Sequence, residues 1–163
     1  MTVLARLGSI LGAAAAALLL CAAPAAAQGQ PSTITSLSPE AAGKCLDAYD
    51  FGRGPWVQMW NCHGGANQSW SVTWNSVSGG WNIRNAASQY CADGSRGRGE
   101  QLMQNVCGNG LGMAWKIDDP AGPTRLESIA HPGLCADIYN WGRSPVVMLW
   151  DCGGQANQYW FLN

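Results

Sequence analysis

One internal repeat constrains this chain more than any other feature of its sequence. The segment from Cys45 to Trp70 returns from Cys135 to Trp160 at the same length and without gaps, and fourteen of the 26 paired positions are identical. A weaker third copy runs from Cys91 to Trp115. The last Trp of the motif therefore recurs twice at a spacing of 45 residues. A fixed period of this size predicts three copies of one supersecondary unit.

The first 27 residues have the pattern of a secretory signal peptide. A basic residue precedes a long run rich in Ala and Leu, and three Ala at 25–27 offer a cleavage site. We therefore expect a secreted, extracellular protein whose mature chain begins near Gln28, with a flexible tail over residues 28–32 and one domain over residues 33–163. No later apolar run approaches the roughly 18 residues that span a bilayer, so we expect no membrane span.

The domain divides into repeats of about 33–78, 79–122 and 123–163. Short apolar stretches separated by Gly, Pro, Asn and Ser are typical of an all-β chain with tight connections. The expected strands are residues 44–48, 56–61, 70–74, 81–85, 90–93, 101–106, 115–118, 125–129, 134–139, 146–151 and 160–162. Residues 34–37 have the apolar spacing of residues 126–129, so we expect them to form a twelfth strand beside the C-terminal one, which closes a threefold barrel.

The cysteines support export. Of the seven Cys, Cys21 lies in the leader, and six remain in the mature chain. Lipidation of Cys21 is the alternative, but Leu20 stands where such signals have a small residue. Equivalent repeats should carry equivalent bridges, which predicts the disulfides Cys45–Cys62, Cys91–Cys107 and Cys135–Cys152. A zinc site is not expected, because the chain has no C-x-x-C pair and only two His.

Charge and aromatic content limit the classes of ligand that we expect. Without Arg6 the chain has eight basic and ten acidic residues, so it offers no basic face for nucleic acid. All nine Trp lie in the mature chain, where they must account for both the core and any binding surface. We expect no cofactor and no bound metal.

The repeated motifs resemble a known family. Each repeat begins with C-[LA]-D, and the two close copies continue with W-x-C and N-Q-x-W, as in the ricin-type β-trefoil lectin domain. The same fold serves as a carbohydrate-binding module on secreted glycosidases. The resemblance covers essentially the whole mature chain, and it implies a β-trefoil of twelve strands, at most one sugar pocket per repeat and no catalysis in the trefoil itself.

The first repeat carries a complete candidate pocket. A sugar ring needs a flat apolar platform and a few fixed polar groups. Trp60 matches the platform, Asp47 would accept hydrogen bonds from two neighbouring hydroxyls, and the Asn67 amide can both donate and accept. Gln58 lies two residues before Trp60, so its side chain should share the face of Trp60. Gln68 matches the glutamine of the Q-x-W motif, to which the resemblance assigns a supporting role.

The third repeat keeps Asp137, Trp150, Asn157 and Gln158, but Met148 replaces Gln58. We therefore expect a weaker or differently selective pocket there. Trp70 and Trp160 match the core tryptophans of the family and are assigned to packing. Three further loop pairs could extend the pocket walls or equally hold the loops in shape: Tyr49 and Tyr139, Phe51 and Trp141, and Arg53 and Arg143.

The second repeat lacks most of this set. Asp93 remains, but Met103 and Asn105 replace the Gln and the platform Trp, and Gly112 and Met113 stand where Asn and Gln would be. We predict that this repeat keeps the fold without the pocket, and that Asp93 is a structural turn residue.

These inferences favour a secreted, non-enzymatic protein that binds galactose- or xylose-type sugars of glycans or polysaccharides as a monomer. The alternative is a protein-binding trefoil, such as a protease inhibitor or a toxin-associated subunit, which would need no matched pockets. A hydrolase is a third reading, but nothing in the repeats places two carboxylates together at the separation that glycoside hydrolysis needs.

Overall fold

The computed structural model describes residues 31–49, 55–140 and 145–163. These residues form an all-β domain of twelve strands with four short 3-10 turns. No helix among them is long and apolar enough to cross a membrane. The strands are β1 (Ser32–Ser36), β2 (Lys44–Tyr49), β3 (Trp56–Asn61), β4 (Ser69–Asn75), β5 (Gly80–Asn85), β6 (Cys91–Asp93), β7 (Met103–Asn105), β8 (Trp115–Lys116), β9 (Glu127–Ser128), β10 (Leu134–Asn140), β11 (Pro145–Asp151) and β12 (Trp160–Leu162). The 3-10 turns are η1 (Pro39–Ala41), η2 (Ala66–Gln68), η3 (Leu111–Met113) and η4 (Ala156–Gln158).

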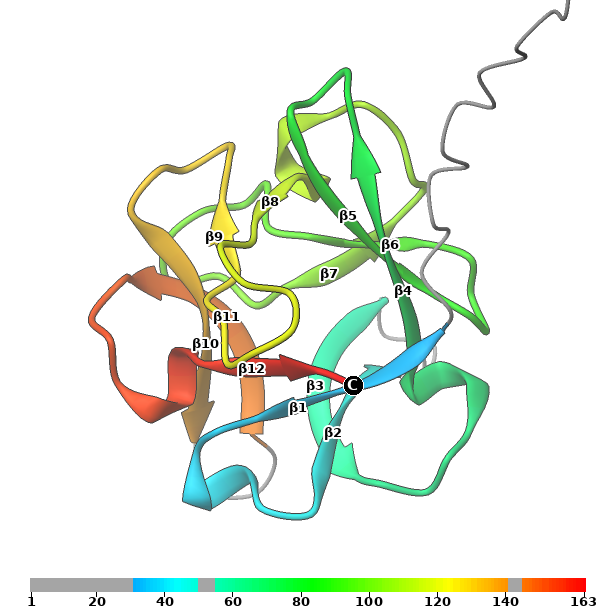
Figure 1. Ribbon diagram of the computed structural model, residues 1–163, viewed down its shortest axis with the longest axis vertical. Helices are drawn as coiled ribbons and strands as arrows, with labels where there is room; N and C mark the ends of the chain where they lie inside the picture. Colours follow the sequence, from blue (N-terminus) through cyan, green and yellow to red (C-terminus); the bar gives the residue numbers. More distant parts are fainter. Residues whose placement is uncertain (1–30, 50–54, 141–144) are drawn as a thin grey trace, which may run out of the picture.

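Six strands close a barrel, in the order β1, β4, β5, β8, β9 and β12. The last gap in the ring lies between β9 and β12. It is closed by Thr124, which precedes β9 and exchanges two backbone hydrogen bonds of 2.9 and 2.8 Å with Trp160 of β12. The predicted pairing of the two ends of the chain is confirmed, because Ile34 of β1 lies opposite Leu162 of β12 (Figure 1). The closed ring leaves no long unpaired edge.

The N-terminal boundary of the domain differs from expectation by one residue. Ser32, which was placed in the flexible tail, is the first residue of β1 and pairs with Trp70 of β4. The ordered sheet therefore begins before residue 33, because β1 pairs with β2, β4 and β12.

The other six strands form three hairpins, β2–β3, β6–β7 and β10–β11, which also pair with one another. Trp56 of β3 lies opposite Met103 of β7, and Val146 of β11 lies opposite Gln58 of β3. Gln101, just before β7, bridges Met148 of β11 and completes the triangle. The hairpins are thus held by neighbouring repeats as well as by the barrel.

Three buried tryptophans connect the barrel to the hairpins. Trp70, Trp115 and Trp160 are at most 1% exposed. Their indole N–H groups donate to the backbone carbonyls of Leu46, Ala92 and Ala136 at 2.9, 3.2 and 3.1 Å, respectively. Such bonds satisfy the polar atom of a side chain that is otherwise fully packed. The assignment of Trp70 and Trp160 to the core is confirmed.

The disulfides match expectation, and the hairpins show the face alternation of a pleated strand. Bridges join Cys45 to Cys62, Cys91 to Cys107 and Cys135 to Cys152. In β3, Met59 is fully buried whereas the next residue, Trp60, is 44% exposed. The pleat of a strand allows only one of two neighbouring side chains to face the core.

The second repeat departs from the expected strand lengths. Its strands β7, β8 and β9 contain three, two and two residues, in place of the longer segments predicted at 101–106, 115–118 and 125–129. Gly97 and Gly99, with φ of 87° and 80°, turn the chain just before β7 in a conformation that other residues rarely adopt. The 3-10 turns were not predicted, since three residues give no readable helical period.

Truncation of a buried tryptophan should destabilise the domain far more than truncation of an exposed one. Trp115→Ala empties a fully packed site, and we expect it to reduce the free energy of unfolding by about 3–5 kcal/mol. Trp74→Ala is the control, because Trp74 is 56% exposed. It should cost no more than about 1.5 kcal/mol, the value of its edge contact with Trp81. Equal losses in denaturant melts would contradict the core assignment.

Candidate functional site

The candidate residues of the third repeat gather around one cavity of about 390 Å³. Asp137 comes from β10, Trp150 from β11, and Asn157 and Gln158 from η4. The Asn157 amide donates to one Asp137 carboxylate oxygen at 2.9 Å, and the Gln158 amide donates to the other at 2.7 Å. Two amides therefore fix the orientation of a carboxylate that is only 5% exposed.

Gln158 holds this carboxylate in place through hydrogen bonds to the backbone. Its amide nitrogen also donates to the backbone carbonyl of Asp151 at 2.8 Å, and its amide oxygen accepts from the Gly153 N–H at 2.7 Å. Gln68 makes the same contacts in the first repeat, with Asp47 and Asn61 as acceptors and the His63 N–H as donor. These bonds agree with the supporting role predicted for Gln68, and Gln158 makes the equivalent set.

Two carboxylates line the third-repeat cavity, and their surroundings shift their pKa values in opposite directions. Burial raises the pKa of Asp137, and the hydrogen bonds from Gln158 and Asn157 only partly offset this effect. The hydrogen bond from Arg98 holds the pKa of the exposed Asp151 below its ordinary range. Arg98 binds Asp151 through two nitrogens, at 2.9 and 2.8 Å, so this second carboxylate is already engaged.

Arg98 also holds the platform of the third repeat. Its guanidinium carbon lies 4.0 Å from the centroid of the Trp150 ring, within the range of a cation–π contact. Tyr139 contacts the same indole, with ring centroids 6.4 Å apart. Arg98 does not line the cavity, so it supports the ring without filling the pocket.

Sequence reasoning missed Arg98, because it belongs to the repeat that was predicted to have no pocket. The available signal was its spacing: Arg98 lies seven residues before Asn105, as Arg143 lies seven residues before Trp150. The second repeat therefore contributes a positioning residue to the third. Phe51, Arg53, Trp141 and Arg143, which were considered as pocket walls, lie outside the described residues.

The first repeat brings together the corresponding set with one rearrangement. Asn67 and Gln68 both donate to the same Asp47 oxygen, Oδ2, each at 2.9 Å, and not to separate oxygens as in the third repeat. The imidazole Nε2 of His63 lies 3.7 Å from that oxygen. Trp60 is exposed on the same hairpin, with Tyr49 beside it at a centroid distance of 6.5 Å.

Gln58 lies on the predicted face but is buried. It stands directly opposite Asp47 across the β2–β3 pair and is 7% exposed. Its amide nitrogen has no hydrogen-bond partner among the described residues. A buried donor without an acceptor costs about 1–3 kcal/mol. The equivalent Met148 is also buried and does not line the third-repeat cavity.

In the second repeat the place of a pocket is filled. The Asp93 carboxylate accepts from the Ser95 N–H at 2.7 Å and from the Asn105 amide at 3.1 Å. A Cβ atom at Gly112 would lie 2.6 Å from the Ser95 Cβ and 2.8 Å from the Asp93 carboxylate, so the turn packs tightly against Asp93. The predicted role of Asp93 as a structural turn residue is confirmed.

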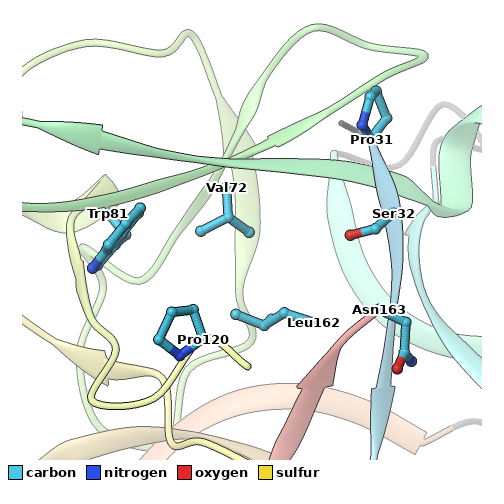
Figure 2. A pocket seen from close by; sticks show the side chains of 7 residues that line it. All are labelled: Pro31, Ser32, Val72, Trp81, Pro120, Leu162 and Asn163. Carbon is cyan, nitrogen blue, oxygen red and sulfur yellow. The ribbon is translucent and has the colours of Figure 1, made fainter. Parts of the chain in front are cut away.

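A larger cavity of about 490 Å³ lies at one end of the barrel, away from these carboxylates (Figure 2). Val72, Trp81, Pro120 and Leu162 supply an apolar lining, and no carboxylate side chain takes part. This cavity lacks the polar set that the two repeats share. Among the described residues, no group of three His, Cys, Asp or Glu could hold a metal ion.

A carboxyl-detected NMR titration should separate the two acidic groups of the third repeat. We expect Asp137 to titrate above the ordinary Asp value of 3.8 and Asp151 to titrate below it. Arg98→Gln should return the Asp151 midpoint towards 3.8 and leave Asp137 unchanged, because only Asp151 bonds Arg98. A midpoint for Asp137 at or below 3.8 would contradict the burial argument.

Comparisons with known proteins agree with this architecture. The model of the ricin-type beta-trefoil lectin domain-like family matches residues 28–93 and 66–147. No curated protein sequence matches the chain. Several solved structures share the fold at low identity, among them a lectin, a designed protein and a toxin. The Macrolepiota procera ricin B-like lectin, solved with lactose, is 22% identical with a TM-score of 0.66, covering 84% of this chain and 96% of the lectin.

The other two are the designed protein ThreeFoil and a mosquitocidal holotoxin. ThreeFoil, which is 3-fold symmetric, is 21% identical with a TM-score of 0.69, covering 81% of this chain and 96% of its own. The holotoxin is 16% identical with a TM-score of 0.70. The match covers 83% of this chain but only 17% of the holotoxin chain. The family match over more than half of the sequence, together with the trefoil architecture, shows that the chain belongs to the ricin-type β-trefoil lectin domain-like family.

Proposed function

We propose that this chain is a secreted, non-catalytic carbohydrate-binding protein with one sugar pocket in the first repeat and one in the third. Its ligands are galactose- or xylose-type units of glycans or polysaccharides. The observation that carries the proposal is the recurrence of one constellation: a buried Asp bonded by an Asn and a Gln, with a Trp exposed beside it. The filled second repeat has no such set.

The geometry suits a sugar ring. The exposed faces of Trp60 and Trp150 can stack on the C–H face of a pyranose, while Asp47 and Asp137 accept hydrogen bonds from hydroxyls at its rim. Hydrogen bonds to an ionised carboxylate contribute about 1.5–3 kcal/mol each. The lactose complex of the Macrolepiota procera lectin supports a galactose-type ligand.

The use of the carboxylates supports a proposal of binding without catalysis. Glycoside hydrolysis needs two carboxyl groups on either side of the scissile bond. In the first repeat the position of Asp151 is occupied by Asn61, which leaves Asp47 alone. In the third repeat Asp151 is held by Arg98 in a two-nitrogen contact. Two modest sites on one body instead gain affinity for a polymeric glycan through avidity.

Removal of both pocket carboxylates should abolish sugar binding while the domain stays folded. Asp47→Ala and Asp137→Ala together delete the acceptor in each pocket, so we expect retention on an immobilised glycan to fall to background. Each single variant should keep one site and lose avidity for a polymer while retaining monosaccharide binding. Affinity electrophoresis in a polymeric glycan measures the loss of avidity. Calorimetry with the monosaccharide unit of the glycan that retains the wild type measures binding at the remaining site.

Asp93→Ala is the matched control, since it removes the equivalent carboxylate from the repeat without a pocket. It should leave sugar binding intact, even though the loss of its turn bonds lowers stability. Normal binding by the double variant, or loss of binding in the Asp93 variant at a temperature where it is folded, would overturn the site assignment.

A further inference from the structure

The two proposed pockets differ in the loop that follows the second cysteine of each disulfide. The first loop reads Cys62-His-Gly-Gly and the third reads Cys152-Gly-Gly-Gln. The first loop thus carries a side chain at its first position, His63, whereas the third loop carries one two residues later, at Gln155. The middle glycines, Gly64 and Gly154, have similar positive φ values of 71° and 78°. The exchange therefore takes place on equivalent turns.

In the first pocket the His63 ring spans the gap between Asp47 and the loop. Its Nε2 lies 3.7 Å from the Asp47 carboxylate, and its Nδ1 accepts from the Gly65 N–H at 3.2 Å. A Cβ atom at Gly65 would lie only 2.6 Å from the imidazole Cε1, so the ring lies directly against this glycine. The imidazole forms a wall on one side of Asp47.

In the third pocket the same place is open. A Cβ atom at Gly153 would meet only the Asp151 carbonyl oxygen, at 3.9 Å. Gln155 and Gly153 both line the cavity, and Gln155 is exposed. The Asp137 carboxylate uses both oxygens for its two amides, whereas Asp47 turns one oxygen to Asn67, Gln68 and His63 together.

We propose that residues His63 and Gly153 determine which part of a glycan each pocket accepts. This inference rests on the proposed function. The first pocket, closed by His63, takes a terminal sugar residue, because such a residue is linked to the rest of the glycan on one side only. The third pocket takes a residue within a chain, because the neighbouring residue can pass over Gly153 and bond the Gln155 amide. A sugar linked on both sides needs two exits, and His63 blocks one of them.

The test uses variants with one pocket each. Asp137→Ala leaves the first pocket, and Asp47→Ala leaves the third. Calorimetry compares a disaccharide with a hexasaccharide of the xylose or galactose series, whichever the wild type binds. The first pocket alone should bind both with affinities within about twofold, whereas the third should prefer the hexasaccharide by roughly fivefold, because the longer chain offers several interior units.

Reciprocal substitutions should exchange these preferences. His63→Gly removes the wall from the first pocket and should raise its preference for the hexasaccharide towards the value of the third. Gly153→His with Gln155→Gly rebuilds the wall in the third pocket and should remove its preference. Gln155→Gly alone separates the amide from the imidazole. It removes the bond to the neighbouring sugar residue but leaves the exit over Gly153 open, so it should lower the preference for the hexasaccharide without abolishing it.

Three outcomes are decisive. Exchange of the preferences supports the inference. Unchanged preferences in folded variants that still bind overturn it and leave the proposed function intact. Failure of the wild type to bind either sugar series, or any other glycan on an array, overturns the proposed function and this inference with it.

Discussion

Each proposed pocket is tied to the core by the hydrogen bond of a buried indole. Trp70 and Trp160 belong to the barrel, yet their N–H groups bond carbonyls of the hairpins, at Leu46 and Ala136. The residues that follow these carbonyls are Asp47 and Asp137, so the position of each carboxylate is tied to the packed core. The disulfides hold the same hairpins beside these carbonyls, since Cys45 directly precedes Leu46 and Cys135 directly precedes Ala136. Pre-positioning of this kind lowers the cost of ordering a site when ligand binds.

The same framework occurs three times, but the pocket chemistry does not. Trp115 bonds Ala92 in the second repeat as its counterparts do elsewhere, and Asp93 follows as expected. Its carboxylate, however, is used to close the turn at Ser95. Arg98 of the same repeat binds Asp151 and stacks on Trp150. A repeat without a pocket thus supports its neighbour, since the hairpins of the trefoil contact one another.

The sequence was sufficient for the features that repeat. The spacing of Trp and paired Cys predicted three equivalent units and one disulfide in each. The trefoil and the core positions of Trp70 and Trp160 followed from the resemblance to the ricin-type family. The apolar spacing at Ile34 was enough to place β1 beside β12. The features that sequence reasoning missed involve contacts between units or the direction of one side chain. Arg98 crosses to another repeat, and Gln58 is buried in the region where the hairpins meet.

The contrast between His63 and Gly153 shows the same limit at the scale of a loop. The two loops differ at their first and third positions, where His63 and Gly65 align with Gly153 and Gln155. Nothing in the spacing shows that the imidazole turns towards Asp47. Met148 replaces Gln58 but does not line the third-repeat cavity, so the weaker or differently selective binding expected there stays a prediction. Side-chain direction in short turns is set by local hydrogen bonds, which alignment of repeats does not reveal.

The central claim is that two pockets in one trefoil bind sugar while the second repeat does not. The most direct test is a two-dimensional ¹H–¹⁵N NMR titration with the sugar that the wild type binds. The account predicts that the indole N–H signals of Trp60 and Trp150 shift to saturation, whereas those of Trp70, Trp115 and Trp160 and the Asn105 amide stay in place. Saturable shifts at Asn105, or at Trp74 and Trp81 with none at Trp60 and Trp150, would contradict it.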